Sequence, residues 1–302
     1  MSKRTLAHVL LLATALIWGA TFSLVKAAIA DVSPLLFNLL RMTLASVVLV
    51  VINRKQLHNI TRPQLLAGAL AGLFLGAGYQ FQTLGLAHTT PAKCAFITGM
   101  LVVLVPIFTL VPAIRPAGTT RPNILAGFGT LLGFAGLLLI TTPPGTVLRN
   151  LVSNIAAGDL IAFVGAVAFA GHLLVLAHTS RTMPAGLLAT LQVSFATITM
   201  IITLPLEQAR ATITSPVILA LVVCSLLGTV AAFTIQSFAQ QVLPPTHTVL
   251  ILTFEPVFAW ITSLIFFHEV LGQRALLGAA LILAGIAVVE FLPGAHATET
   301  PA

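Results

Sequence analysis

Residues 79–93 read YQFQTLGLAHTTPAK, and residues 233–247 read FTIQSFAQQVLPPTH. In this register Gln82 is opposite Gln236 and Lys93 is opposite His247. Each segment is an apolar run that carries a central glutamine and ends in a proline turn. Self-similarity of this kind indicates that the chain contains an internal repeat.

The repeat extends in both directions from these segments. LIWGATFSL from Leu16 aligns with VAFAGHLLV from Val167, and the same offset continues into the next apolar block. The further correspondences keep the same order along the chain: Trp18 with Phe169, Thr21 with His172, Arg41 with Gln192, Pro106 with Pro256, and Gly129 and Gly136 with Gly278 and Gly285.

The composition predicts that lipid is the solvent of this chain. Of its 302 residues, 58% are hydrophobic and 7% are charged, whereas soluble domains carry roughly 25% charged residues. The net charge of +7 arises from scattered lysines and arginines, so it forms no basic face for nucleic acid. Cys94 and Cys224 lie within apolar blocks without a metal-ligand or CxxC spacing, and they are interpreted as packing residues.

Ten apolar blocks follow one another, each close to the roughly 20 residues that cross a bilayer as a helix. They are Leu6–Ile29, Leu35–Ile52, Leu65–Ala87, Ala92–Val111, Asn123–Ile140, Leu160–Ala177, Gly186–Leu206, Val217–Ala239, Thr246–Phe267 and Ala275–Phe291. The first block follows Lys3-Arg4 but is longer than a signal peptide core, so it is interpreted as a span. The predicted fold is an all-α integral membrane protein with ten transmembrane helices.

The two halves, residues 1–146 and residues 147–302 with a short C-terminal tail, would each hold five helices. An odd number of helices inverts the second half relative to the first, and inverted repeats are typical of secondary transporters with a midplane substrate site. Alternate loops divide the basic residues eight against five, which favours cytoplasmic N- and C-termini. The eight are Lys3, Arg4, Arg54, Lys55, Arg62, Arg115, Arg121 and Arg181.

The chain resembles the drug/metabolite transporter superfamily, in its EamA-like branch of ten helices arranged as two inverted five-helix repeats. The residues that carry the resemblance are Trp18-Gly19, Arg41, Phe96-Ile-Thr-Gly99, Pro106, Gly158-Asp159, Glu255-Pro-Val-Phe258, His268-Glu269, and Gly278 with Gly285. The resemblance implies a multi-pass transporter of small metabolites, such as amino acids or related compounds, in the bacterial inner membrane. The first half departs from the pattern, because Ala113-Ile-Arg115 stands where the second half has Phe267-His-Glu269.

Glu255 is the most informative polar residue, because a charge in the middle of a span costs roughly 2.5 to 3.5 kcal/mol. We expect it to face a cavity and to exchange a proton during transport, with Arg41 as a candidate partner in a charge network. The structural alternative is a carboxyl group that bonds the backbone freed by Pro256. Arg41 is shallow enough that its side chain could instead reach the headgroups. Pro256 and Pro106 are predicted helix breaks.

The predicted substrate cavity gathers polar and aromatic residues from several spans: Trp18, Thr21, Tyr79, Gln82, Thr98, His172, Gln192 and Gln236. Aromatic rings would stack on a planar or cationic substrate, and repeat-related glutamines would bond one substrate from both sides. The alternatives are ordinary packing for the rings and interhelical hydrogen bonding for the glutamines and the histidine.

We therefore predict a secondary transporter, an exporter or exchanger, that works by alternating access. The sequence has no Walker motif, so a proton or substrate gradient would supply the energy. An intramembrane enzyme is the alternative of another class, but clustered catalytic groups and metal-ligand spacings are missing from the sequence. A passive channel is the third hypothesis. No cofactor, metal or catalytic residue is expected; the expected partners are a small-molecule substrate, the lipid bilayer and protons.

Overall fold

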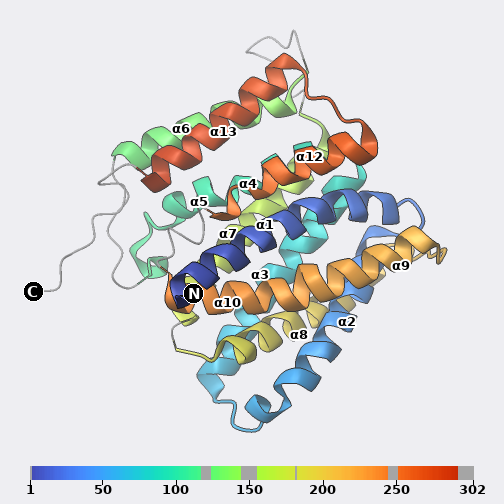
Figure 1. Ribbon diagram of the computed structural model, residues 1–302, viewed down its shortest axis with the longest axis vertical. Coiled ribbons are helices and arrows are strands. Elements are labelled where there is room, and N and C mark those ends of the chain that lie inside the picture. Colours follow the sequence, from blue (N-terminus) through green and yellow to red (C-terminus); the bar gives the residue numbers. More distant parts are fainter. Residues whose placement is uncertain (1, 117–123, 144–154, 181, 244–250, 292–302) are drawn as a thin grey trace, which may run out of the picture.

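The computed structural model describes residues 2–116, 124–143, 155–180, 182–243 and 251–291. Within these ranges the regular structure is helical, apart from an isolated bridge between Val32 and Ala211. In chain order (Figure 1) the elements are α1 (Lys3–Ala28), α2 (Pro34–Asn53), η1 (Arg54–Leu57), α3 (Arg62–Ala87), α4 (Pro91–Gly99), α5 (Leu101–Phe108), η2 (Pro112–Ile114), α6 (Ile124–Thr141), α7 (Ala157–Thr179), α8 (Ala185–Thr203), η4 (Leu204–Leu206), α9 (Ser215–Val222), η5 (Val223–Ala231), α10 (Ala232–Val242), α12 (Glu255–Phe267) and α13 (Gln273–Phe291).

Eight helical segments in the described part of the chain are long and apolar enough to cross a membrane: Lys3–Ala28, Pro34–Leu57, Arg62–Ala87, Pro91–Phe108, Ile124–Thr141, Ala157–Thr179, Ala185–Leu206 and Ser215–Val242. Glu255–Phe267 and Gln273–Val288 are shorter apolar helices. The chain is therefore a multi-pass membrane protein, with eight such spans against the ten expected. Residues 246–250 of the expected ninth span lie outside the described residues, and α12 begins only at Glu255.

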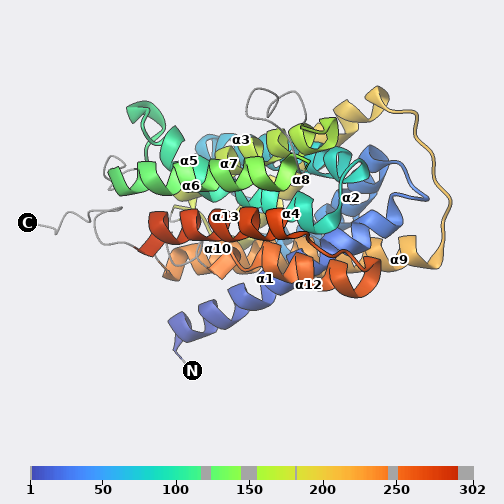
Figure 2. The same cartoon turned by 90° about the horizontal axis from the view of Figure 1, so that it is seen from above.

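The helices form one bundle in which neighbours in space are often distant in sequence. α3 packs along both α7 and α8, α1 lies against α12 and α10, and α6 pairs with α13 at one side of the bundle (Figure 1). Figure 2 shows that α1 begins and α13 ends at the same end of the bundle. Gly68, Gly72 and Gly76 of α3 face α8, so this glycine stripe serves packing within the chain.

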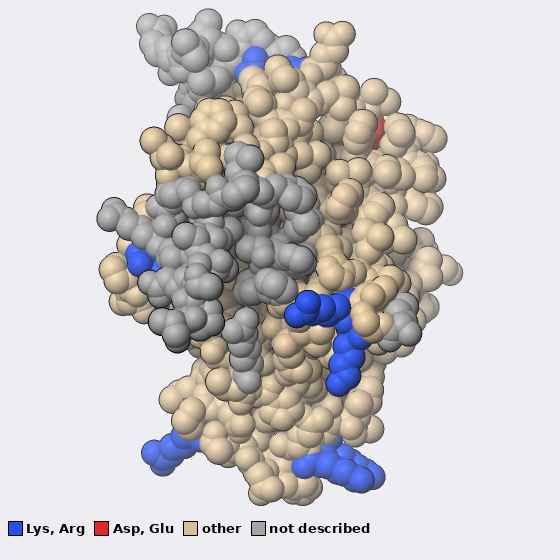
Figure 3. Space-filling model, turned by 60° about the vertical axis from the view of Figure 1, so that its left-hand side comes forward, with Lys and Arg blue, Asp and Glu red and all other residues tan. Residues whose placement is uncertain are grey.

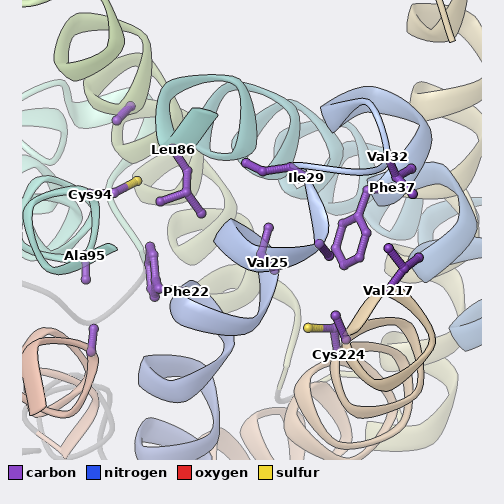
Figure 4. Close-up of a cluster of buried hydrophobic side chains, with 14 of the residues drawn as sticks. Phe22, Val25, Ile29, Val32, Phe37, Leu86, Cys94, Ala95, Val217 and Cys224 are labelled. Carbon is purple, nitrogen blue, oxygen red and sulfur yellow. The ribbon is translucent and has the colours of Figure 1, made fainter. Parts of the chain in front are cut away.

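Apolar side chains cover much of the outside of the bundle as well as its interior. Leu66, Ile202 and Leu131 are 70%, 71% and 69% exposed, which suits contact with lipid chains. Charged side chains are sparse among the described residues on the face in Figure 3. Inside, Figure 4 shows part of a buried cluster in which α1, α2, α3, α4 and α9 meet around residues such as Phe22 and Phe37.

The glycine pairs of the repeat form the contact between α6 and α13. A Cβ atom on Gly136 would collide with the carbonyl oxygen of Gly278, and one on Gly285 would come within 2.5 Å of that of Gly129. The repeat exchanges Gly129 with Gly278 and Gly136 with Gly285, so each contact is the symmetry mate of the other. A pair of contacts related in this way is what a two-fold axis between α6 and α13 would produce.

The break in the fourth apolar block differs from the expected one. We expected it at Pro106, but that residue lies inside α5, and the interruption falls at Met100, between α4 and α5. Next to this interruption α12 approaches α4 closely, since a Cβ atom on Gly99 would lie 3.2 Å from the Pro256 ring. Pro256 itself occupies the first turn of α12, where a proline costs no backbone hydrogen bond.

Candidate functional site

A cavity of about 90 Å³ lies among α1, α3, α4, α5, α7, α10, α12 and α13. The expected residues that line it are Trp18, Thr21, Tyr79, Gln82, Thr98, His172 and Gln236, together with Glu255 and Pro256. Gln192 lies behind the wall, while Arg41 and Pro106 are also absent from the lining. Both halves of the chain thus contribute to one small cavity, which suits a small solute.

The aromatic wall follows the symmetry of the repeat. The Tyr79 and Phe169 rings lie 5.2 Å apart at an interplanar angle of 90°, and the Trp18 and Phe233 rings lie 5.5 Å apart. Under the repeat, Tyr79 corresponds to Phe233 and Phe169 corresponds to Trp18, so these two pairs are mates. Tyr79 and Phe233 meet each other at 6.4 Å. Corresponding aromatic residues of the two halves therefore meet in the cavity wall.

The glutamines that the repeat pairs both reach the wall, with different hydrogen bonds. Gln82 Nε2 donates to Thr98 Oγ1 at 3.1 Å, which joins α3 to α4. The Gln236 side chain is 5% exposed, and its Oε1 atom is buried without a hydrogen-bond partner in the described structure. Gln82 thus has the interhelical role that is common in membranes, while Gln236 retains an unused acceptor.

His172 bonds its neighbour in α8 behind the cavity wall. Its Nε2 atom donates to Gln192 Oε1 at 2.7 Å, and its ring meets Phe233 edge to face at 6.0 Å. His172 therefore forms an interhelical hydrogen bond and also lines the cavity. Gln192 is fully buried, and we place it as a support for His172.

Arg41 is buried, with 2% of its surface exposed, so its side chain does not reach the headgroups. It also forms no ion pair with Glu255. Within the described residues, the ion pair that the structure shows joins Lys93 and Asp159. Instead, Nε donates to Thr229 Oγ1 at 3.0 Å, and Nη2 donates to the Tyr79 hydroxyl at 3.2 Å and to the Gly228 carbonyl at 3.3 Å. The buried guanidinium group therefore donates its hydrogen bonds to neutral hydroxyl and carbonyl oxygens and not to a carboxylate.

The π-helix η5 supplies two of these three acceptors, Thr229 Oγ1 and the Gly228 carbonyl. The Gly228 carbonyl accepts from Arg41 and, at 2.8 Å, from Trp18 Nε1, while Thr229 donates to the Cys224 carbonyl. In a π-helix the backbone bonds span five residues, and such segments are frequent at functional sites. η5 therefore fixes both the Trp18 ring and the Arg41 side chain beside the cavity.

Glu255 is the first residue of α12, and its half-buried side chain lines the cavity. No hydrogen bond or ion pair joins its carboxylate to another described residue. Its position depends on Gly19 of α1, where a Cβ atom would come within 2.8 Å of the Glu255 carbonyl and 2.7 Å of Phe258 Cβ. The missing side chain at Gly19 lets α12 approach α1 closely enough to present Glu255 to the cavity.

A set of polar contacts joins the two halves at the end of the bundle opposite the start of α1. Lys93 Nζ lies 2.6 Å from Asp159 Oδ2, and Glu269 accepts from the Thr90 hydroxyl and, at 3.1 Å, from the Ala92 backbone N–H. We call Lys93, Asp159, Thr90 and Glu269 the interhalf clamp. Asp159 also accepts from the Thr89 hydroxyl at 2.7 Å. The clamp therefore fastens the α3–α4 turn to α7 and to the end of α12.

Sequence reasoning did not select several residues of the wall. Phe169 and Phe233 both line the cavity, and their positions opposite Trp18 and Tyr79 in the repeat would have identified them. Phe22, Leu173 and Val102 also line it, but they resemble every other apolar residue of their spans. The part played by Thr229 has no signal in the sequence, since it depends on η5.

Comparison with known proteins agrees with this architecture. The model of the EamA-like transporter family matches twice, over residues 5–142 and 156–291. An "Uncharacterized transporter" of Archaeoglobus fulgidus is 30% identical over 291 residues, covering 95% of this chain and 87% of the relative. The "Uncharacterized transporter YvbV" of Bacillus subtilis is 26% identical over 298 residues, covering 95% and 92%. A solved structure titled "Crystal structure of protein" has the same fold, with a TM-score of 0.65, 20% identity, and coverage of 95% and 96%.

Two copies of the family domain thus account for the repeat that the glutamines, glycines and aromatic pairs follow. The relatives matched over nearly the whole chain are named as transporters, which agrees with a multi-pass bundle that encloses a small cavity. The chain belongs to the EamA-like transporter family and is a membrane transporter of the drug/metabolite transporter superfamily.

Proposed function

We propose that this protein is a secondary transporter that exports or exchanges small metabolites across the bacterial inner membrane by alternating access. The observation that carries the proposal is the cavity lined by repeat-related residues of both halves, with the Glu255 carboxylate in its wall. Inverted-repeat transporters place their substrate between the repeats, so that rocking of one half against the other exposes it to either side.

The proposed topology is ten crossings in two inverted halves, residues 1–146 and 147–302, with cytoplasmic N- and C-termini. The common end of α1 and α13 supports an even number of crossings, and the mate contacts between α6 and α13 support inversion. For this topology α12 and α13 must both cross the membrane despite their shorter apolar lengths. Reporter fusions at residues 29, 58, 143 and 270 would test the sidedness of four separate loops.

We propose that Glu255 also couples transport to protons. A carboxylate without a protein partner can take up either a proton or a substrate group, and a site that holds one or the other at a time produces exchange. The wall holds two further titratable side chains, Tyr79, whose hydroxyl accepts from Arg41, and His172, whose Nε2 bonds Gln192. Glu255 is the carboxylate of the wall, and no described residue bonds it.

Untargeted mass spectrometry of the growth medium would test the transport function. Cells would overproduce the wild type, Glu255→Gln or Glu207→Gln at matched membrane levels. Glu207 accepts from the Leu35 backbone N–H outside the cavity, so Glu207→Gln removes a carboxylate without touching the wall. We expect a metabolite enriched with the wild type and Glu207→Gln and absent with Glu255→Gln. Medium identical to that of the empty vector would contradict export.

Liposomes would separate a carrier from a channel. With the exported metabolite as substrate, a carrier gives saturable counterflow, in which unlabelled internal substrate drives uptake of label. A channel gives flux that rises linearly with concentration, and conversion of the metabolite in the liposomes would indicate an enzyme. We expect counterflow.

A further inference from the structure

The charge in the cavity wall points to the class of substrate. Among the described residues that line the cavity, Glu255 is the sole member of the Asp, Glu, Lys and Arg group. It shares the cavity wall with aromatic rings from both halves, and its carboxylate bonds no described residue. Resting on the proposed transport function, we infer that the cavity takes a small protonated amine with an apolar body.

The free-energy argument begins with desolvation. A carboxylate within an apolar wall has lost water contacts and gains nothing from a protein counter-ion, so a cationic ligand recovers that loss by charge-assisted hydrogen bonding. Rings add to this attraction, because a cation within about 6 Å of an aromatic face is drawn to it. The Trp18, Tyr79, Phe169 and Phe233 rings surround the position where the rest of the ligand would lie.

An N–H donor fits the wall better than a quaternary cation. Gln236 Oε1 is a buried acceptor without a partner in the described structure, and a buried polar atom of this kind lowers its free energy when a donor reaches it. Gln236 and Glu255 both belong to the second half, on α10 and α12. A primary ammonium group has three donors and can serve both oxygens, whereas a trimethylammonium group has none.

The helix start by itself does not explain the carboxylate. Acidic residues in the first turn of a helix are stabilised by the free N–H groups there, yet no backbone N–H donates to the Glu255 side chain. An anionic or zwitterionic ligand would require a cation in the wall. Arg41 is outside the lining, and its Nε and Nη2 atoms already donate to Thr229, Tyr79 and Gly228. His172 lines the cavity, but its Nε2 atom is engaged by Gln192 Oε1.

A charge-matched ligand series would test the inference. The full-length protein in nanodiscs would be titrated with phenethylamine, 2-phenylethanol, 3-phenylpropionate, phenylalanine and phenethyltrimethylammonium at one pH and ionic strength. These probes share a phenyl ring and differ in charge and donors. We expect phenethylamine to bind roughly tenfold or more tightly than the neutral alcohol, the anion and the zwitterion, since a charge-assisted bond contributes about that factor. It should also exceed the quaternary analogue.

The variants assign the preference to the carboxylate. Glu255→Gln should lose the preference for amine over alcohol, whereas Glu207→Gln should retain it; monodispersity and melting temperature would show that both are folded. Should Glu255→Gln not fold, Gln236→Leu provides the second arm and should reduce the advantage of the primary over the quaternary amine at least threefold. Tighter binding of anion, zwitterion or alcohol than of amine would overturn the inference while leaving transport intact. Binding of no probe would also overturn it, and the medium analysis alone would then decide the transport function.

Discussion

The guanidinium carbon of Arg41 lies 4.4 Å from the centre of the Tyr79 ring, and Nη2 of the same side chain donates to the Tyr79 hydroxyl at 3.2 Å. Tyr79 lines the cavity and Arg41 does not. The cation therefore holds the ring in place from behind the wall, and it stabilises the site without presenting its charge to a substrate.

Replacement of Arg41 by its repeat mate tests this supporting role. Arg41→Gln leaves Thr229 Oγ1, the Tyr79 hydroxyl and the Gly228 carbonyl with fewer donors, and we expect the unfolding free energy to fall by about 2 kcal/mol. Tyr79→Phe removes one of these bonds and should cost about half as much. Thermal unfolding in detergent measures both. A loss of transport by Arg41→Gln at unchanged stability would instead assign Arg41 to the substrate.

The glycine contact between α6 and α13 should not tolerate an added side chain. Gly136→Ala places a methyl group against the Gly278 carbonyl oxygen, so we expect a loss of about 2 kcal/mol or failure to accumulate in the membrane.

Gly127→Ala on the same helix is the matched control for that change. Gly127 is exposed and has nothing within 4 Å of an added Cβ atom, so alanine should be neutral or slightly stabilising. Equal melting temperatures for Gly127→Ala and Gly136→Ala would contradict the packing described here.

Release of the interhalf clamp should open the end of the bundle that it fastens. Cys94 follows Lys93 in α4 and is fully buried. In a Cys224→Ser background, the pair Asp159→Asn and Glu269→Gln removes the carboxylates of the clamp, and we expect alkylation of Cys94 by N-ethylmaleimide to accelerate several-fold, because the thiol reacts only when water reaches it.

Arg62→Gln provides the control for the labelling experiment. Arg62 is an exposed residue at the start of α3, away from the clamp, and its replacement should leave the Cys94 rate unchanged. An unchanged rate in the clamp variant would show that these contacts do not restrain the opening.

Phe169 should contribute to substrate affinity although it was not selected from the sequence. Phe169→Leu keeps an apolar side chain and loses the edge-to-face contact with Tyr79, so we expect the KM of counterflow to rise roughly five- to tenfold. Phe128→Leu removes a ring from the outer surface of α6, where the side chain is 55% exposed, and should leave the KM unchanged. A similar rise in both variants would indicate a general loss of folding.

Much of the architecture was predictable, because apolar runs separated by turn residues predict membrane-spanning helices. The repeat also indicated which distant residues meet, since Trp18 and Phe169, which correspond in register, line the same cavity. The glycines of α6 and α13 were predicted as a shared pattern, and the structure shows them in mutual contact.

Other features depended on contacts that no local pattern specifies. The helix is interrupted at Met100, whereas Pro106, the residue with the intrinsic breaking tendency, lies inside α5. The partners of Arg41 depend on η5, and a π-helix has no distinctive composition in an apolar segment. Charge alone suggested pairing with Glu255, whereas hydroxyl and carbonyl acceptors lay closer.

The correspondence between the halves fails at the residues that carry charge. Glu255 precedes Pro256, whereas Val105 precedes Pro106, and Arg41 is matched by the neutral Gln192. A pair of identical five-helix subunits would bring every such residue to the site twice, and two carboxylates or two guanidinium groups would repel one another across the axis. Joining the halves in one polypeptide lets a single mutation alter one side of the cavity alone, so the site can hold one carboxyl group without its symmetry mate.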